Sequence, residues 1–268
     1  MKKNVSLMVM ALLGYLMVVV PSTAAEPKAA VEAYNRGVSI ARKRNIDEAI
    51  DAFTEAIRLS PTFTRAYCNR GVVYEMKGDF DKAIADFTKA IQLDPKDAET
   101  HKDRGANYHK KGDLDRAIAD YTRAIELNPK YAEAYNARGL ACRKKNDLDR
   151  AMADYTKAIQ LDPKYAEAYN NRGVIYENKG DLDKAIADYT KTIQLNPKYA
   201  RTYFNRGVAY QRKGDLDRAI ADYTKAIQLD PKDAGAYHNR GVAYEQKGEK
   251  SRAEEDFAQA KKLGYKPE

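Results

Sequence analysis

Small and apolar side chains recur along the chain with the spacing of amphipathic helices. Between residues 166 and 199, Tyr169, Gly173 and Tyr176 follow the i, i+4, i+7 pattern of one buried stripe. A second stripe begins at Ala185 and Tyr189 and continues through Thr192, Ile193 and Leu195. The segment therefore predicts two helices that pack against each other along their apolar faces.

The same pattern returns every 34 residues over most of the chain. Seven glycines keep this interval: Gly37, Gly71, Gly105, Gly139, Gly173, Gly207 and Gly241. Six prolines keep it as well: Pro61, Pro95, Pro129, Pro163, Pro197 and Pro231. A fixed period of this size predicts a repeat array, in which each helix pair buries its apolar face against its neighbours. We number the places within each copy from 1 to 34.

Short polar segments separate the predicted helices. Within a copy, Gly180 suits the left-handed residue that ends a helix, and Asp181 is a favoured N-cap for the next one. Asn146 takes the place of this glycine in the fourth copy and Arg44 in the first. Between copies, Asp, Asn or Ser precedes the recurring proline, and this pair predicts that a helix starts at the proline.

These residues resemble the tetratricopeptide repeat family. The resemblance rests on Tyr at place 4, Gly at 8, Tyr at 11, Ala at 20, Tyr or Phe at 24, Ala at 27 and Pro at 32. It implies an all-α fold, an α-solenoid in which antiparallel helix pairs stack into a right-handed superhelix, with first helices that line a concave groove. The seven repeats would span residues 30–63, 64–97, 98–131, 132–165, 166–199, 200–233 and 234–267.

Residues 1–25 have the layout of a secretory signal peptide. Lys2 and Lys3 precede an apolar run from Val5 to Val20, and small residues follow as far as Ala25. The run is shorter than the ~20 apolar residues that usually span a bilayer. We therefore expect an exported protein of the periplasm or the medium, with an uncleaved anchor in the inner membrane as the alternative.

The formal net charge of +8 raises the question of a nucleic-acid partner. The five places that the resemblance assigns to the groove (2, 5, 9, 12 and 13) carry eight basic and six acidic residues. Most other lysines alternate with aspartates, as they do on a solvated helix face. We expect no nucleic-acid partner, and a nucleic-acid-binding helical repeat is the minor alternative.

Arginine at place 7 departs from the leucine that is common in the family. It occurs in all seven copies: Arg36, Arg70, Arg104, Arg138, Arg172, Arg206 and Arg240. Six copies carry Asp at place 23: Asp86, Asp120, Asp154, Asp188, Asp222 and Asp256. The sequence predicts one ion pair between these places in each helix pair. An arginine ladder for an acidic ligand is the alternative.

Catalytic and metal-binding patterns are weak in this sequence. The three histidines are scattered, and the Asp and Glu residues recur by copy, as scaffold residues do. Cys142 is expected to be a small core residue, whereas Cys68 faces the predicted groove, and no internal disulfide is expected between them. We predict no enzyme activity, no cofactor and no metal site.

The places assigned to the groove vary strongly between copies, except for place 9. Uniform places build the stack, whereas varied places are free to specify a partner. We predict that the following residues bind it: Tyr34, Lys102, Asn136, Arg143, Asn170, Glu177, Phe204, Arg212, His238 and Glu245. The family's carboxylate clamp is not matched, because place 9 is apolar and Ala137 stands where the clamp needs Asn.

The sequence thus predicts a non-enzymatic protein–protein interaction scaffold of the bacterial cell envelope. Its partner would be a peptide segment or a helix of another protein, held in the concave groove. The alternative from another class is a self-associating or membrane-anchored structural protein. A monomer is expected, and the oligomeric state stays open.

Overall fold

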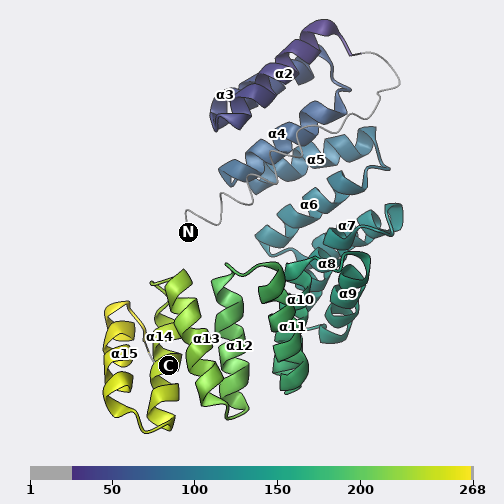
Figure 1. Cartoon of the computed structure of the whole chain (residues 1–268). Coiled ribbons are helices and arrows are strands. Elements are labelled where there is room, and N and C mark those ends of the chain that lie inside the picture. The colour runs from purple at the N-terminus through teal and green to yellow at the C-terminus, as the bar shows by residue number, and fades with distance from the viewer. Residues whose placement is uncertain (1–25, 267–268) are drawn as a thin grey trace. The chain divides into compact units, whose positions relative to one another are not determined.

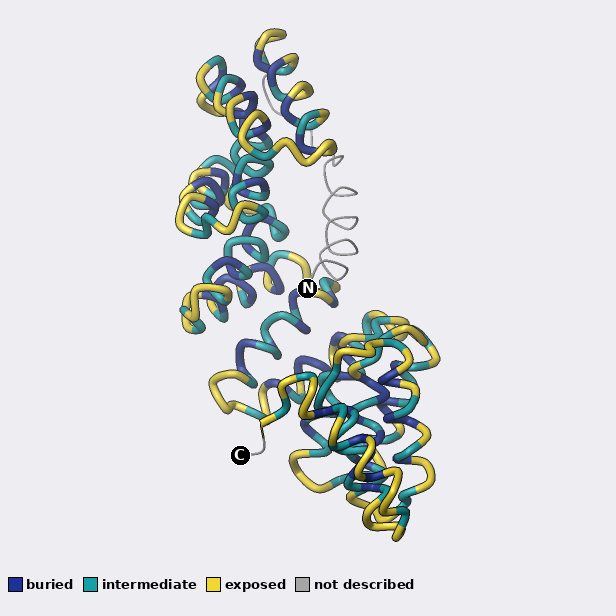
Figure 2. The backbone as a smooth tube through the Cα atoms, turned by 90° about the vertical axis from the view of Figure 1, so that its left-hand side faces the viewer, coloured by how far each residue is buried: buried dark blue, intermediate teal, exposed yellow. Residues whose placement is uncertain are grey.

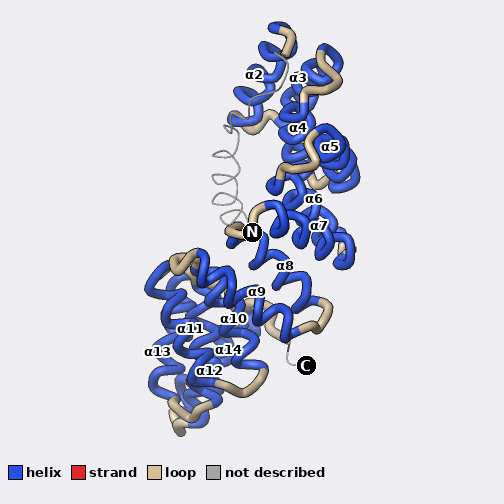
Figure 3. Tube along the Cα trace, turned by 90° about the vertical axis from the view of Figure 1, so that its right-hand side faces the viewer, coloured by secondary structure: helices blue, strands red, loops and turns tan. Residues whose placement is uncertain are grey.

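The computed structural model describes residues 26–266, and within this range it consists of helices joined by short turns, without strands (Figure 3). The predicted signal peptide, residues 1–25, lies outside the described residues. The fourteen described helices are α2 (Lys28–Arg42), α3 (Ile46–Leu59), α4 (Thr64–Lys77), α5 (Phe80–Leu93), α6 (Ala98–Lys111), α7 (Leu114–Leu127), α8 (Ala132–Lys144), α9 (Leu148–Leu161), α10 (Ala166–Asn178), α11 (Leu182–Leu195), α12 (Ala200–Arg212), α13 (Leu216–Leu229), α14 (Ala234–Gln246) and α15 (Lys250–Lys262). None of these helices has the length and apolar character that crossing a membrane requires.

The helices form two compact units, with the division between Ala141 and Cys142 inside α8. In the first unit, α2 to α7 pack on one another in chain order (Figure 1). In the second unit, α9 to α15 do the same. Contact is most extensive between the two helices of one copy and less so between successive copies. The fold is the all-α solenoid that the period predicts.

Each helix pair closes where a glycine of the first helix meets an aromatic ring of the second. A Cβ atom at Gly173 would lie 2.8 Å from Tyr189 Cε1, and one at Gly207 would lie 2.8 Å from Tyr223 Cε1. Such a distance is below van der Waals contact, so the helices can approach this closely only with glycine at place 8. The alanines at place 20, such as Ala185, are fully buried beside this contact. Figure 2 shows the buried residues along the helices and the exposed ones gathered at the turns.

The predicted ion pairs between places 7 and 23 are confirmed. Arg172 donates from Nε and Nη2 to the two carboxylate oxygens of Asp188, both at 2.8 Å. Its Nη1 donates to Thr156 in the preceding copy. The side chains of the pair keep 18% and 8% of their exposure, so both charges are largely withdrawn from water. The hydrogen bond to Asp188 raises the pKa of the Arg172 guanidinium.

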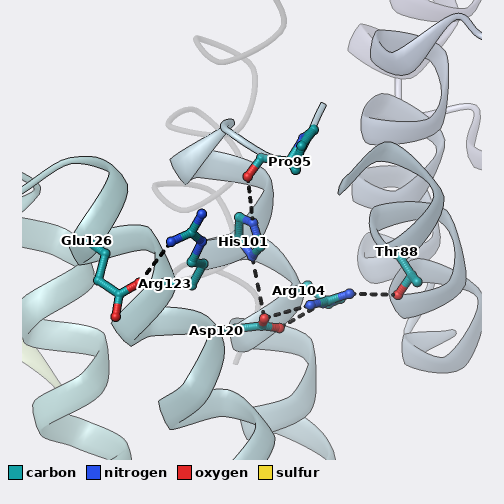
Figure 4. A network of polar contacts seen from close by, with 7 residues as sticks. All are labelled: Thr88, Pro95, His101, Arg104, Asp120, Arg123 and Glu126. Carbon is teal, nitrogen blue, oxygen red and sulfur yellow. Dashed lines mark hydrogen bonds and ion pairs between the residues drawn. The ribbon is translucent and has the colours of Figure 1, made fainter. Parts of the chain in front are cut away.

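The same arrangement recurs in both units. Figure 4 shows it in the third copy, where Arg104 on α6 lies between Asp120 on α7 and Thr88 on α5. The other described pairs are Arg70–Asp86, Arg206–Asp222 and Arg240–Asp256. Each of these arginines therefore fastens its own helix pair and also the second helix of the copy before.

The turns within copies follow the prediction in backbone conformation. Gly180 has a φ of +79°, and Arg44 and Asn146 adopt a φ of 65° at the equivalent place. Asp181 occupies the N-cap position of α11, but its side chain does not cap the helix. It instead forms an ion pair with Lys184 at 2.7 Å. The expected capping is made by four equivalent aspartates: Asp79, Asp113, Asp147 and Asp215.

The prediction that a helix starts at each recurring proline is wrong. Helix α5 ends before Asp94, and α6 begins only at Ala98, with Asp97 as its N-cap. Asp94 Oδ1 accepts a hydrogen bond from the Lys96 backbone N–H at 3.1 Å. The polar residue before proline therefore closes a turn between copies. Local side-chain bonding of this kind competes with helix initiation.

Several of the lysines that contribute to the positive net charge form exposed ion pairs with aspartates of the preceding copy. Lys77 Nζ lies 2.6 Å from Asp47 Oδ1, and Lys179 Nζ lies 2.9 Å from Asp149 Oδ1. Further pairs of this kind are Lys111–Asp81, Lys213–Asp183 and Lys247–Asp217. These contacts agree with the prediction that the lysines lie on solvated helix faces and pair with aspartates there.

Removal of one buried carboxylate should cost far more than removal of an exposed one. Asp188→Ala leaves the Arg172 guanidinium without its partner, and we expect a loss of about 3 kcal/mol in the free energy of unfolding. Asp183→Ala is the matched control on the same helix, since Asp183 pairs with Lys213 but is 82% exposed. Its loss should stay below about 1 kcal/mol. Equal urea midpoints for the two variants would contradict a stabilising role of the buried pair.

Substitution of Gly173 by alanine should destabilise the protein although alanine favours helices. The new methyl group would collide with the Tyr189 ring, and overpacking of this kind costs about 1–3 kcal/mol. Gly235→Ala in α14 is the control, because a Cβ there meets only the Asp233 side chain at 3.2 Å and Phe204 beyond it. That variant should change the free energy of unfolding by less than about 1 kcal/mol, because the gain in helix propensity is opposed by the close contact with the Asp233 carboxylate that caps α14. Urea unfolding of both variants measures the difference, and stabilisation by Gly173→Ala would show that the close approach is not required.

Candidate functional site

The candidate site is the face of the first helices formed by places 2, 5, 9, 12 and 13, which we call the first-helix face. Within each unit, successive first helices lie side by side, as α2 and α4 do, and as α10, α12 and α14 do. Polar side chains join these neighbours. Tyr34 Oη on α2 accepts a hydrogen bond of 2.8 Å from Asn69 Nδ2 on α4. The first-helix face is therefore held by side chains from consecutive copies.

In the first unit, polar contacts between α4 and α6 centre on Glu75. Asn107 Nδ2 donates to Glu75 Oε2 at 2.7 Å, and Lys110 Nζ donates to Glu75 Oε1 at 2.6 Å. Lys102 Nζ lies 2.9 Å from Asp103 Oδ1 and 5.8 Å from the ring centroid of Tyr131. Lys102 is therefore engaged by its own copy on this face.

In the second unit, Glu177 and Arg212, two residues of the predicted binding set, contact each other. Glu177 accepts a hydrogen bond of 2.7 Å from Tyr189 Oη. Arg212 Nη1 donates to the Glu177 backbone oxygen at 2.9 Å and lies 3.7 Å from its carboxylate. Burial, followed by the charge of Glu177, raises the pKa of the Tyr189 hydroxyl. Arg212 keeps 45% of its side-chain exposure, so it still faces solvent.

The aromatic members of the predicted site are partly covered by neighbours. Phe204 lies 5.9 Å from the ring centroid of Tyr223, and the Arg201 guanidinium lies 5.1 Å from the Phe204 ring. His238 stacks on Tyr265 with centroids 4.1 Å apart, and burial lowers the pKa of its imidazole. Phe204 and His238 are thus packed against aromatic rings of their own copies, and only part of each ring faces outward.

The two asparagines of the predicted site are buried. Asn136 is 6% exposed and Asn170 is 7% exposed, and Asn170 Oδ1 accepts a hydrogen bond of 3.1 Å from Thr202. A partner docked on this face would reach little of either side chain, because place 5 is covered by the next copy. Arg143 is partly exposed, and Glu245 is exposed on α14. The accessible members of the predicted set are therefore Arg143, Arg212 and Glu245 and the edges of the aromatic rings, whereas Glu177 keeps only 17% of its side-chain exposure.

The sequence alone did not single out a row of polar residues on α6 of the third copy, Glu99, Asp103 and Asn107, which we call the polar stripe. We interpreted the acidic residues as scaffold that recurs by copy, yet Asp103 stands where five copies have Asn, and Asn107 stands where the others have Ser or apolar residues. Asn107 is fully buried and bonds to both Glu75 and the Asp103 backbone oxygen. An amide at place 10, which is otherwise apolar or Ser, was the signal that pointed to this stripe.

Glu99 lies at the start of this stripe in an unfavourable electrostatic environment. Its Oε1 atom is buried and has no hydrogen-bond partner. Burial, with repulsion from Asp103, Asp97 and Glu133 and partial compensation by Lys102, raises the pKa of Glu99 to about 7. Burial likewise raises the pKa of the Asp103 carboxyl group. In this environment, a nearby positive charge would stabilise the ionised form of the Glu99 carboxyl group.

The two cysteines differ in their surroundings. Cys142 is 1% exposed, in agreement with its prediction as a core residue. Neither Cys68 nor Cys142 forms a disulfide, as expected, and burial raises the pKa of Cys68 to about 12, so this thiol is a poor nucleophile. Between residues 26 and 266, no three His, Cys, Asp or Glu side chains are placed to hold a metal ion.

The raised pKa of Glu99 predicts a pH-dependent stability. Its folded-state pKa lies above the ordinary value of 4.5, so the folded protein loses stability as the pH rises from about 4.5 through about 7. Glu99→Gln removes this loss. Between pH 5 and pH 8, the free energy of unfolding of the variant should therefore rise by about 1 kcal/mol relative to that of the wild type. A shift of one pKa unit corresponds to ~1.4 kcal/mol, and the expected gain is less than the full shift would give because solvent screens this partly exposed group.

Urea unfolding at the two pH values measures this gain. Glu167→Gln is the control, because Glu167 holds the same place in the fifth copy and is exposed. An equal response of the two variants to pH would contradict the assignment of the raised pKa to Glu99.

Comparisons with known proteins agree with this geometry. Family models described as TPR repeat match residues 41–78, 105–142, 139–180 and 212–248. Models described as Tetratricopeptide repeat match residues 64–97, 166–199, 188–221 and 234–263. Together these matches cover most of the chain. Comparison with curated protein sequences gives no match.

Several solved structures share the fold. A tetratricopeptide repeat protein from Parabacteroides merdae is 24% identical over 89% of this chain and 94% of its own, with a TM-score of 0.69. MamA is 35% identical over 62% of this chain and 96% of its own, with a TM-score of 0.55. YrrB, described as a TPR protein with an unusual peptide-binding site, is 24% identical over 70% of this chain and 97% of its own, with a TM-score of 0.57.

Proposed function

We propose that this chain, which belongs to the tetratricopeptide repeat family, is a non-enzymatic scaffold that binds a peptide segment or a helix of another protein on its first-helix face. The family and the fold support a role in protein interaction in general. The choice of this face and of a single extended or helical segment as the partner is our proposal.

The observation that carries the proposal is the contrast between the places that build the stack and those on the first-helix face. Places 8, 20 and 24 hold glycine, alanine and aromatic residues that close each helix pair, and place 7 holds arginines such as Arg172, whose side chain keeps 18% of its exposure. On the first-helix face, by contrast, side chains differ from copy to copy. Arg212 and Glu245 there remain exposed. Within each unit, a surface that varies from copy to copy along stacked helices suits the recognition of a segment with a defined side-chain order.

The comparison structures support the same function indirectly. The printed description of YrrB attributes a peptide-binding site to that protein. Because its identity to this chain is 24%, the likeness extends to the fold and does not transfer the binding residues. The binding residues proposed for this chain therefore rest on its own first-helix face.

We also propose that the protein acts in the cell envelope of a bacterium. The support is the composition of residues 1–25, with its basic start, apolar run and small residues before the expected cleavage site. Fractionation of cells that express the full chain, with N-terminal sequencing of the product, tests this proposal. A full-length product in the cytoplasm would exclude export, and a full-length product in the membrane fraction would favour the anchored alternative.

Peptide display on the immobilised full chain tests the binding function. Random linear peptides selected on the wild type should bind less to Arg212→Glu/Glu245→Arg, which exchanges two exposed charges of the first-helix face without a change in net charge. We expect a loss of about tenfold in affinity, because a wrongly charged contact costs of order 1 kcal/mol or more. The control variant is Lys225→Glu/Glu255→Arg, which makes the same exchange on the exposed sides of α13 and α15.

The outcome separates the proposed surface from its alternatives. Selection of peptides that distinguish the two variants supports the first-helix face. Peptides that bind both variants equally would place the binding surface elsewhere. Failure to select any peptide, together with a mass in light scattering that rises with concentration, would favour self-association.

A further inference from the structure

Helices α2 and α15 are the first and the last of the described helices (Figure 1). In the copies between them, the first helix packs on the second helix of the copy before, as α4 does on α3 and α14 does on α13. Within the described residues, α2 has no second helix before it, and α15 has no first helix after it. Each of these two helices therefore presents the side that other copies use to join their neighbour.

Four pairs of places meet where one copy joins the next. Place 28 packs in one apolar cluster with place 3 of the next copy, and place 21 does so with place 10. Place 25 accepts a hydrogen bond from the arginine at place 7, and place 18 forms an ion pair with the lysine at place 14. Between the sixth and seventh copies, these pairs are Ile227–Ala236, Ile220–Ala243, Thr224–Arg240 and Asp217–Lys247.

On α2 and its C-cap residue, the corresponding places are exposed and polar. They hold Glu32, Arg36, Ser39 and Lys43 at places 3, 7, 10 and 14, and we call these four residues the α2 end face. In the six later copies, places 3 and 10 are buried. Glu32 lies 3.9 Å from Lys28 in a highly exposed ion pair, which contributes little. Ala52 stands where other copies have the aspartate that pairs with the place 7 arginine, so Arg36 lacks that carboxylate.

On α15, the four places that would receive a further copy are also exposed. They hold Ser251, Glu254, Ala258 and Lys261 at places 18, 21, 25 and 28, and we call these four residues the α15 end face. Place 28 is isoleucine in the six other copies, and place 21 is isoleucine or methionine. A terminal helix needs a polar outer side for solubility, but solubility does not dictate which charge stands at which place.

The charge at place 28 of α15 is opposite to the charge at place 3 of α2. These two places lie together at an internal junction, where Ile227 and Ala236 share one apolar cluster. In the same register, Lys261 of one molecule would lie beside Glu32 of another. Both residues depart from the apolar or small residues of the other copies, and they depart with opposite signs.

A second match involves Glu254 at place 21. Its counterpart is Ser39 at place 10, whose hydroxyl can donate a hydrogen bond to a carboxylate. Places 7 and 14 lie one helical turn to either side of place 10, so Arg36 and Lys43 flank this serine. An acidic residue of α15 would therefore meet a hydroxyl group between two basic residues of α2.

We propose that the α15 end face of one molecule docks on the α2 end face of a second copy of this chain, in the register that joins successive copies within the chain. Ion pairs replace the apolar contacts of an internal junction, so the association is weak and is reduced by salt. It joins unlike surfaces and is therefore not limited to a twofold dimer. The first-helix face uses other places, so peptide binding and end-to-end docking are independent of each other.

Charge reversal at one matched pair tests the docking and its register. Glu32→Lys sets a lysine against Lys261, and Lys261→Glu sets a glutamate against Glu32. Each variant alone should associate at least about tenfold more weakly than the wild type, because like charges then meet at every junction. An equal mixture of the two variants has opposite charges at every mixed junction and should associate within about threefold of the wild type. Sedimentation velocity of the purified full chain, over a range of concentrations at low ionic strength, measures the weight-average mass.

Two further variants make the same charge changes outside the end faces. Glu48→Lys alters an exposed residue at place 19, where the six other copies carry Lys or Arg. Lys262→Glu alters the neighbour of Lys261 at place 29, which is exposed in every copy. Both variants, alone or mixed, should associate as the wild type does.

Three results would each overturn the proposal. One is a wild-type mass that stays at the monomer value at every concentration. Another is equal association of the wild type and both end-face variants, as expected if the apolar run of residues 1–25 drives the association. The third is a mixture of Glu32→Lys and Lys261→Glu that associates no better than either variant alone. Because both residues are exposed, circular dichroism should show the same helix content and thermal unfolding in the variants as in the wild type.

Discussion

The close approach of a glycine in one helix to an aromatic ring in the next is the constraint on which this structure depends. At Gly173 and Tyr189 the two helices are so near that any side chain larger than hydrogen would overlap the ring. The same contact recurs in copies of both units, with Phe53, Phe87, Tyr121, Tyr223 and Phe257 as the rings. It fixes the distance within a helix pair, and the place 20 alanines fill the space beside it. A pair built in this way still exposes an apolar side, which the next copy covers.

The arginines at place 7 link each helix pair to the second helix of the preceding copy. Each described pair is bidentate, and the third nitrogen of the guanidinium reaches a threonine in the second helix of the preceding copy. The guanidinium of Arg172 also lies 5.7 and 5.8 Å from the rings of Tyr169 and Tyr176. Because the arginine is engaged on all these sides, it is a fastening between helices and is withdrawn from any acidic ligand.

With the stack fixed by these uniform contacts, the first-helix face can vary without loss of the fold. The second unit uses this freedom for the Glu177–Arg212 pair, and the first unit uses it for the carboxylates around Glu99. The strain in the first unit is electrostatic: a carboxyl group is held near others with its Oε1 unpaired. Such local costs are tolerated in a repeat array, since each copy contacts only its neighbours and the remaining copies supply the stability.

The sequence by itself determined the helix pairs, their order, the left-handed residues at Arg44 and Asn146 and the pairing of places 7 and 23. The helix pairs and turns recur in all seven copies and the aspartate at place 23 in six of them, so that the copies specify these features together. It misplaced the helix starts near Pro95, because Asp94 closes a turn by a local hydrogen bond that the residue types alone do not distinguish from an N-cap. Only the tertiary structure showed that Asn136 and Asn170 are covered while Arg212 faces solvent. Exposure at these places depends on how closely the next copy packs. The contact of Glu75 in the second copy with Asn107 in the third copy depends on the same packing, because these two residues lie 32 positions apart in the chain.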